Sequence, residues 1–153
     1  MIVLAVGLTS EPIVPITTPG PRRSAATEWP PPVDWLVLSA DPRTRDRVLE
    51  TIRRDGLTSH AALARAPQGP PGYGRRYRCA FVDLVHAVGD DDGMARWLEA
   101  LRLYRTRLAI RGADGDSDHE RRARVAGAVA YLPGEIDPRG LARLVTEISR
   151  LAA

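Results

Sequence analysis

Aspartates follow two apolar runs of the sequence and could supply oxygen ligands to a metal ion. The first run ends at Asp83 and leads into an acidic loop, and the second run, 107–110, leads into another. The acids of the two loops are Asp90, Asp91, Asp92, Asp114, Asp116 and Asp118. Carboxylate oxygens are the ligands that Mg²⁺ and Ca²⁺ take in proteins. The weak candidates for such a site are Asp83, Asp92 and Asp114.

The spacing of the second loop argues against a calcium-binding loop. Asp114, Asp116 and Asp118 alternate as at the start of such a loop, but His119 stands where a glycine is needed and Val125 where a bidentate glutamate is needed. Acidic loops are more often solvated turns and helix N-caps, and Asp118 ahead of His119 fits a cap. We therefore expect no resident metal ion.

Asp83 lies at the carboxyl end of a predicted strand, where parallel α/β sheets usually place their active or ligand-binding sites. The run 78–84 is short, rich in β-forming residues and bounded by turn signals, which is typical of a buried strand of a parallel sheet. Ligands and reacting groups gather at the carboxyl ends of such strands. Cys79, the only cysteine, lies in the same run, so we expect neither an intrachain disulfide nor a cysteine metal site.

Strand and helix patterns alternate from residue 33 onward. Asp41–Pro42 and Asp137–Pro138 each predict a helix start, with Asp as the N-cap and Pro at the first helical position. Prolines and glycines between 66 and 77 exclude a regular helix, so the second helix should be short or missing. The predicted strands are 35–38, 57–63, 78–84, 107–110 and 129–132, and the predicted helices are 42–54, 94–104, 118–126 and 138–151. Right-handed crossovers then give an α/β fold, a doubly wound five-stranded parallel sheet in the order 2-1-3-4-5.

The composition predicts a globular domain preceded by a proline-rich segment. The chain has 153 residues, 44% of them hydrophobic, which suits one domain with an adequate core, and we assign that domain to 33–153. Residues 1–32 begin with a short apolar segment and continue as a linker dense in Pro, Thr and Ser. The apolar start lacks the basic flank of a signal peptide and the length of a membrane span. We therefore expect a cytoplasmic protein with no membrane partner.

The basic residues are all arginines, because the 22 Lys and Arg positions include no lysine. They are scattered over several predicted helices among Asp and Glu, and the formal net charge is only +3. A nucleic-acid-binding protein usually concentrates its positive charge on one face. We therefore do not expect nucleic acid as a partner.

Across roughly 34–151 the sequence resembles the receiver domain of bacterial response regulators, which has a flavodoxin-like fold. The stretch 37–45 (VLSADPRTR) resembles the first strand and the start of the first helix of that family. The stretch 126–132 (AGAVAYL) is more specific and resembles the end of the fourth helix and the fifth strand. The strand that ends at Asp83, and the Asp92-Gly93 pair after it, complete the resemblance.

The resemblance implies a phosphorylation site that has lost most of its machinery. The family accepts a phosphoryl group from a histidine kinase on an aspartate at the end of the third strand, which matches Asp83. It holds the required divalent cation with this aspartate and an acidic pair, where this chain has Ser39 and Ala40. The family's hydroxyl residue is matched by Gly112 and its lysine by Gly134. Asp83 is thus a vestigial phosphoacceptor of a degenerate receiver, or pseudo-receiver, and we expect it to hydrogen-bond nearby loop amides.

The resemblance also implies an interaction surface. In the family, the fourth helix, fifth strand and fifth helix carry the output, and the aromatic residue that matches Tyr131 changes position on activation. Arg121, Arg122 and Arg124 belong to this surface, and Tyr and Arg are enriched at binding hot spots. The alternative to a binding surface is an ordinary basic helix face beside a half-buried tyrosine. We expect a phosphorylation-independent interaction module of signal transduction, without enzyme activity, that docks a protein partner or a second copy of itself.

Two other functions stay open at this point. One is an atypical receiver that is phosphorylated at Asp83, and this function would require Mg²⁺. The other is a regulatory domain that binds a metal or a small molecule at the acidic rim.

Overall fold

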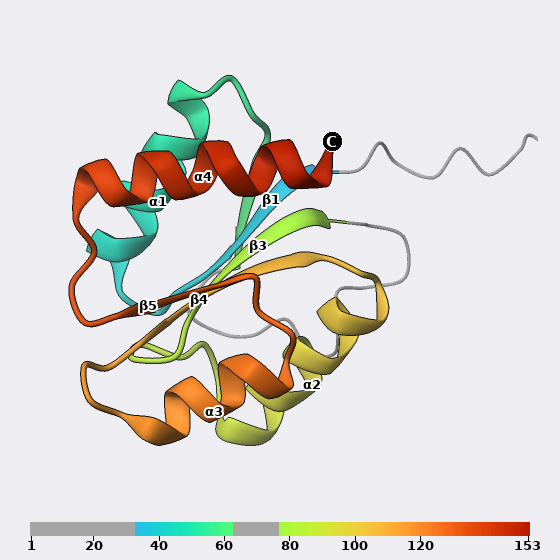
Figure 1. Cartoon of the computed structure of the whole chain (residues 1–153), viewed down its shortest axis with the longest axis vertical. Coiled ribbons are helices and arrows are strands. Elements are labelled where there is room, and N and C mark those ends of the chain that lie inside the picture. Colours follow the sequence, from blue (N-terminus) through green and yellow to red (C-terminus); the bar gives the residue numbers. More distant parts are fainter. Residues whose placement is uncertain (1–32, 63–76) are drawn as a thin grey trace, which may run out of the picture.

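A single sheet of five parallel strands, with helices on both faces, forms the computed structural model, which describes residues 33–62 and 77–153 (Figure 1). The strands lie in the order β2-β1-β3-β4-β5. They are β1 (Val33–Leu38), β2 (Ser59–Ala62), β3 (Tyr77–Asp83), β4 (Arg107–Gly112) and β5 (Ala130–Pro133). The helices are α1 (Pro42–Arg54), α2 (Asp91–Leu103), α3 (Ser117–Val125) and α4 (Pro138–Ala152). The prediction of an α/β fold with a parallel sheet is confirmed.

One predicted element of the first half of the chain differs from the structure, and another is not tested by it. The second strand was predicted over 57–63, whereas β2 begins two residues later and spans Ser59–Ala62 of the described residues. The segment in which the second helix should be short or missing, 63–76, lies outside the described residues, as does the proline-rich segment 1–32. The division into 1–32 and 33–153 therefore stays a prediction.

Helices α1 and α4 pack against each other and cover one face of the sheet (Figure 1). Each begins as predicted, because the Asp41 side chain accepts from the N–H of Thr44 and the Asp137 side chain accepts from the N–H of Gly140. The hydrogen bonds from Thr44 lower the pKa of Asp41. The buried residues that these helices press against the strands are Val48, Ile52, Leu141, Val145 and Ile148, which meet Trp35, Val37, Cys79, Phe81 and Ala109.

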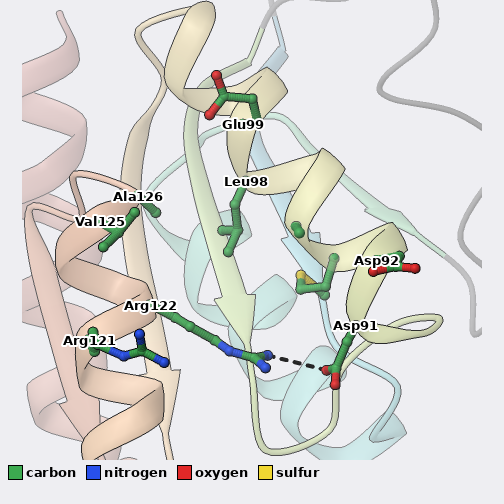
Figure 2. Close-up of a pocket in the computed structure, with 10 residues that line it drawn as sticks. Asp91, Asp92, Leu98, Glu99, Arg121, Arg122, Val125 and Ala126 are labelled. Carbon is green, nitrogen blue, oxygen red and sulfur yellow. Dashed lines mark hydrogen bonds and ion pairs between the residues drawn. The ribbon is translucent and has the colours of Figure 1, made fainter.

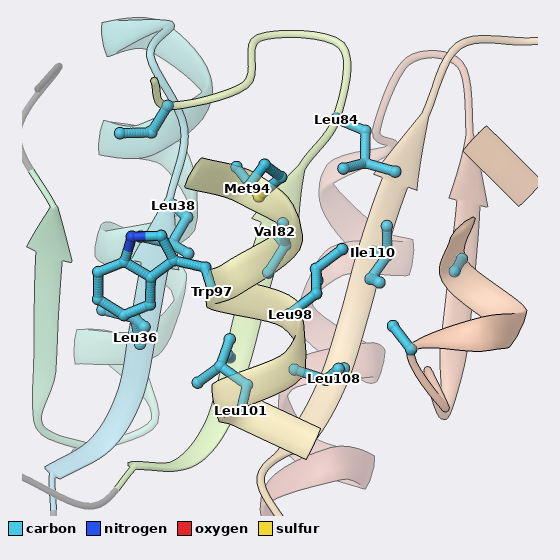
Figure 3. Close-up of a cluster of buried hydrophobic side chains, with 14 residues drawn as sticks. Leu36, Leu38, Val82, Leu84, Met94, Trp97, Leu98, Leu101, Leu108 and Ile110 are labelled. Atoms are coloured by element: carbon cyan, nitrogen blue, oxygen red, sulfur yellow. The ribbon is translucent and has the colours of Figure 1, made fainter. Parts of the chain in front are cut away.

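Helices α2 and α3 cover the opposite face, and α2 supplies most of the contact (Figure 3). Four buried side chains of α2 lie on the strands, namely Met94, Trp97, Leu98 and Leu101. The shorter α3 buries only Ala123 within its span and leaves Val125 77% exposed. Helix α3 therefore contributes little to the buried core on this face.

Cys79 is a structural thiol of the core. Its side chain is buried, and burial, with a smaller contribution from Asp34, raises the pKa of the thiol to about 12. The helices of the described part of the chain include none with the length and hydropathy of a membrane span.

Candidate functional site

Asp83 ends β3 at the carboxyl edge of the sheet and is fully buried. Its Oδ1 accepts from the backbone N–H groups of Val85 (3.0 Å) and His86 (3.2 Å). Its Oδ2 accepts from the Ser39 hydroxyl (2.9 Å) and from Nη1 of Arg111 (3.3 Å). The predicted hydrogen bonds to loop amides are confirmed. Both oxygens of the carboxylate are thus occupied by donors of the protein itself.

Arg111 is a partner of Asp83 that the sequence analysis did not predict. The register of β3 and β4 places it directly beside Asp83, and its side chain is only 12% exposed. Nε donates to the carbonyl of Gly134 (2.9 Å), and Nη1 also donates to Oγ1 of Thr44 (3.3 Å). The sequence does contain a signal that could have identified this partner. Arg111 follows the apolar run 107–110, and the predicted strand order places that strand beside the strand that ends in Asp83. We call Ser39, Asp83, Arg111 and the two loop amides the Asp83 site.

Ser39 and Ala40 directly follow β1, where the family's acidic pair would stand. Ser39 is fully buried, and besides its bond to Asp83 its Oγ accepts from the N–H of Asp41 (3.3 Å). The N–H of Ala40 donates to the carbonyl of His86 (2.8 Å). A divalent cation would meet one carboxylate here instead of several, with a guanidinium already on that carboxylate. The residues present do not fit a resident Mg²⁺.

Two of the loop acids, Asp90 and Asp116, cap helices instead of sharing an ion. Asp90 caps α2 through the N–H of Gly93 (2.7 Å). Asp116, and not Asp118 as predicted, caps α3 by accepting from the N–H groups of Asp118 and His119. Both residues were acids next to the helix start, so the sequence alone did not separate them. The hydrogen bond from His119 lowers the pKa of Asp116.

The metal candidates Asp92 and Asp114 are exposed, while Asp83 is buried beneath its four donors. Within residues 33–62 and 77–153, no group of three or more His, Cys, Asp or Glu side chains is placed to hold one metal ion. The structure therefore does not bring the predicted candidates together.

Tyr131 and Gly112 form a second polar position on the same edge of the sheet. The ring of Tyr131 lies over Gly112, so a Cβ added to Gly112 would stand 2.7 Å from Cζ of Tyr131 and would collide with its hydroxyl. The hydroxyl is buried and has no hydrogen-bond partner among the described residues. Burial, followed by the charges of Glu120, Asp116 and Asp114, raises the pKa of Tyr131. Gly112 thus opens the space that the tyrosine ring fills.

A groove of about 400 Å³ separates α2 from α3 (Figure 2). Its apolar lining includes Met94, Leu98, Val125 and Ala126. Acidic side chains of α2 and basic side chains of α3 face each other across it, and Nη1 of Arg122 reaches Oδ1 of Asp91 at 3.2 Å. We call this feature the α2–α3 groove.

The four residues that were predicted to bind a partner do not form one surface in the structure. Arg121 and Arg122 line the α2–α3 groove. Arg124 is exposed and pairs with Glu120 of its own helix, while Tyr131 turns its hydroxyl toward Gly112. The partner-binding role of all four stays a prediction, and the apolar lining of the groove is a feature that the prediction did not contain.

Comparisons with solved structures identify the fold, whereas comparisons of sequence find no match. No family model matches the chain, and no curated protein matches it in sequence. Among solved structures, it is similar to a CheY-like response regulator receiver domain protein from Methanospirillum hungatei, with a TM-score of 0.62, 18% identity and coverage of 79% of this chain and 96% of that one. It is also similar to a response regulator from Thermotoga maritima, with a TM-score of 0.56, 20% identity and coverage of 78% and 98%. A chemotaxis response regulator of Vibrio cholerae gives a TM-score of 0.57, 16% identity and coverage of 76% and 98%. The chain has the fold of receiver domains.

Proposed function

From the receiver fold and the occupied Asp83 carboxylate, we infer that this chain is a phosphorylation-independent pseudo-receiver, a module of signal transduction that works by docking a protein. The observation that carries this proposal is the Asp83 site, in which four donors of the chain hold one buried carboxylate. No chemical step at Asp83 is part of the proposed function, and the protein is not an enzyme.

Phosphoryl transfer to Asp83 would have to dismantle this arrangement. The attacking carboxylate oxygen must be free to approach phosphorus, yet Oδ2 is bound by Ser39 and Arg111 and Oδ1 by the loop amides. Transfer also depends on positive charge that is fixed around the phosphoryl oxygens, which metal ions ordinarily supply. Arg111 offers one such charge, and it is already used by Asp83. These contacts favour a fixed Asp83 over a phosphorylated one.

Phosphorylation is tested directly by mass. Wild type and Asp83→Asn are incubated with Mg²⁺ and acetyl phosphate, and the intact mass of each protein is measured. We expect neither protein to gain a phosphoryl group. Thermal melts with Mg²⁺ and beryllofluoride should likewise coincide with melts without them. A phosphoryl group on wild type that is absent from Asp83→Asn would overturn the proposal in favour of the atypical receiver.

The α2–α3 groove supports a docking role, and its charges favour a second copy of the chain as the occupant. Asp92 and Glu99 lie on the α2 wall and Arg121 on the α3 wall, and the exposed Val125 adds an apolar contact. Glu99 pairs with Arg102 and Arg121 with Asp118 of its own helix, but exposed ion pairs of this kind contribute little and can be exchanged for contacts with a partner. In a twofold dimer, the acidic wall of one copy can face the basic wall of the other. Complementary charge of this kind sets the register of an interface and makes association sensitive to salt.

Sedimentation velocity over a range of concentrations and salt tests this dimer. Arg121→Glu should weaken association, and adding Glu99→Arg should restore it, because the pair then has the opposite polarity. Arg53→Glu, an exposed change on α1 across the sheet, is the control and should leave association unchanged. A wild type that stays monomeric at all concentrations would remove the second copy as the occupant and leave a different protein in that place.

A further inference from the structure

A polar pocket of about 280 Å³ opens beside the Asp83 site at the carboxyl edge of the sheet. Helix α1 contributes Arg43 and Arg47, the loop after β3 contributes His86, and the end of β4 contributes Arg111. The neighbouring strands β1 and β3 lead into helices on opposite faces of the sheet (Figure 1). Open α/β sheets bind ligands at such a reversal of winding. We call this feature the arginine pocket.

The lining of the arginine pocket offers two guanidinium groups without an ion pair among the described residues, those of Arg43 and Arg47. Three guanidinium groups face two carboxylates, those of Asp41 and Glu135. Asp41 is already engaged, because its side chain accepts from the N–H groups of Arg43 and Thr44 and from the Thr44 hydroxyl. The carboxylate of Asp83 beneath the pocket is held by Arg111. Arg111 and Asp83 neutralise each other, so the attraction for an anion rests on the side chains of Arg43 and Arg47 and on the donors that Arg111 leaves unused.

Several donors of the lining are free to bind that anion. The side chains of Arg43 and Arg47 are exposed, and within the described residues neither has an ion pair or a side-chain hydrogen bond. Arg111 uses Nε and Nη1 but has no hydrogen bond from Nη2 to any described residue. The first amides of α1 are taken by Asp41, so the arginine side chains, and not the helix end, would supply the binding.

We propose that the arginine pocket binds a small phosphorylated molecule, a phosphate monoester or a diphosphate, without a metal ion. Guanidinium groups match phosphate oxygens in a bidentate way, and these charge-assisted hydrogen bonds are among the strongest that side chains make. A phosphate group carries a charge of about −1.5 to −2 at neutral pH, which suits three arginines better than a single carboxylate does. The pocket does not use the α2–α3 groove, so this proposal stands or falls separately from the docking role.

Isothermal titration calorimetry at constant ionic strength, with EDTA present, tests the proposal on the full chain. The titrants are pyrophosphate, adenosine monophosphate and citrate. The test variant is Arg43→Gln with Arg47→Gln, both exposed and outside the core. The matched control is Arg53→Gln with Arg139→Gln, which removes two exposed arginines that do not line the pocket.

Wild type should bind pyrophosphate or the monophosphate saturably and more tightly than citrate. The test variant should weaken the Kd by about ten-fold or more, because each lost charge-assisted bond contributes at least that much. The control should stay within about two-fold of wild type. The proposal is overturned if neither phosphate compound binds saturably, if the two variants lose affinity equally, or if citrate binds as tightly as pyrophosphate.

Discussion

Two neighbouring positions on the carboxyl edge of the sheet each bury a polar group, but they differ in the hydrogen bonds that this group makes. At the end of β3, the Asp83 carboxylate has four hydrogen bonds from the chain. Between β4 and β5, the Tyr131 hydroxyl has none among the described residues. A buried polar group without a partner costs stability, whereas one with all its partners fixes the local structure. The hydrogen bonds therefore fix the Asp83 carboxylate in one position, whereas the Tyr131 side chain is positioned by its packing over Gly112.

The largest expected effect comes from removing the cation of the first position. Arg111→Met keeps much of the side-chain volume but leaves the Asp83 carboxylate buried without its guanidinium. We expect the free energy of unfolding to fall by about 3 kcal/mol or more, as for a buried ion pair that loses one partner. Urea denaturation measures the change. Arg47→Met, an exposed change on the same edge, should stay within about 0.5 kcal/mol of wild type, and equal effects of the two variants would show that Asp83 does not depend on Arg111.

Filling the space above Gly112 should have the next largest effect. The added methyl group of Gly112→Ala would collide with the Tyr131 ring and with Cβ of His119. We expect a loss of about 1–3 kcal/mol in the free energy of unfolding, as for an overpacked core. The cost should fall when Gly112→Ala is made in a Tyr131→Ala background, and a double-mutant cycle measures that coupling. If the cost is the same in both backgrounds, the ring is not what occupies the space.

Removing the unpartnered hydroxyl should have a smaller effect of the opposite sign. Tyr131→Phe keeps the ring over Gly112 and deletes the buried hydroxyl, which has no partner among the described residues. We expect the free energy of unfolding to rise by up to about 1 kcal/mol, because the desolvation of that hydroxyl is no longer a cost. Tyr104→Phe, at a 51% exposed tyrosine, is the control and should change nothing measurable. A clear loss of stability in Tyr131→Phe would mean that the hydroxyl makes a favourable interaction.

The smallest effect concerns alkaline pH. Burial raises the pKa of Tyr131 above its ordinary value of 10.0, so the folded protein keeps the phenol protonated where the unfolded chain releases the proton. The stability from this shift is fully present below pH 10.0 and is lost as the pH rises toward the higher pKa of the folded state. Melting curves from pH 9 to 11 should therefore show a steeper loss for wild type than for Tyr131→Phe. Parallel curves would rule out this contribution.

The sequence predicts well what depends on neighbours in the chain. Asp41 and Asp137 are recognised as N-caps because the cap and the amides it binds lie within three residues. The buried strand that ends in Asp83 follows from a short apolar run, and its bonds to loop amides follow from the same proximity. The choice between Asp116 and Asp118 fails for the converse reason, since both acids suit the same helix start.

What the sequence does not predict depends on register and on packing at a distance. Arg111 meets Asp83 only because β3 and β4 pair with these two residues side by side, and it meets Gly134 only because β5 lies next to β4. The ring of Tyr131 can lie over Gly112 because position 112 has no side chain, a steric fact that spacing along the chain does not contain. The arginine pocket is likewise assembled from four separate segments.

The two outermost strands of the sheet bear on how copies of this protein can meet. β2 and β5 lie at its two edges, and each spans four residues in the part of the chain that the structure describes. β5 ends in Pro133, which has no N–H to offer a further strand. Short edge strands and edge prolines are devices by which proteins avoid joining sheet to sheet and forming aggregates. Growth into an extended sheet by strand pairing is thus disfavoured at both edges.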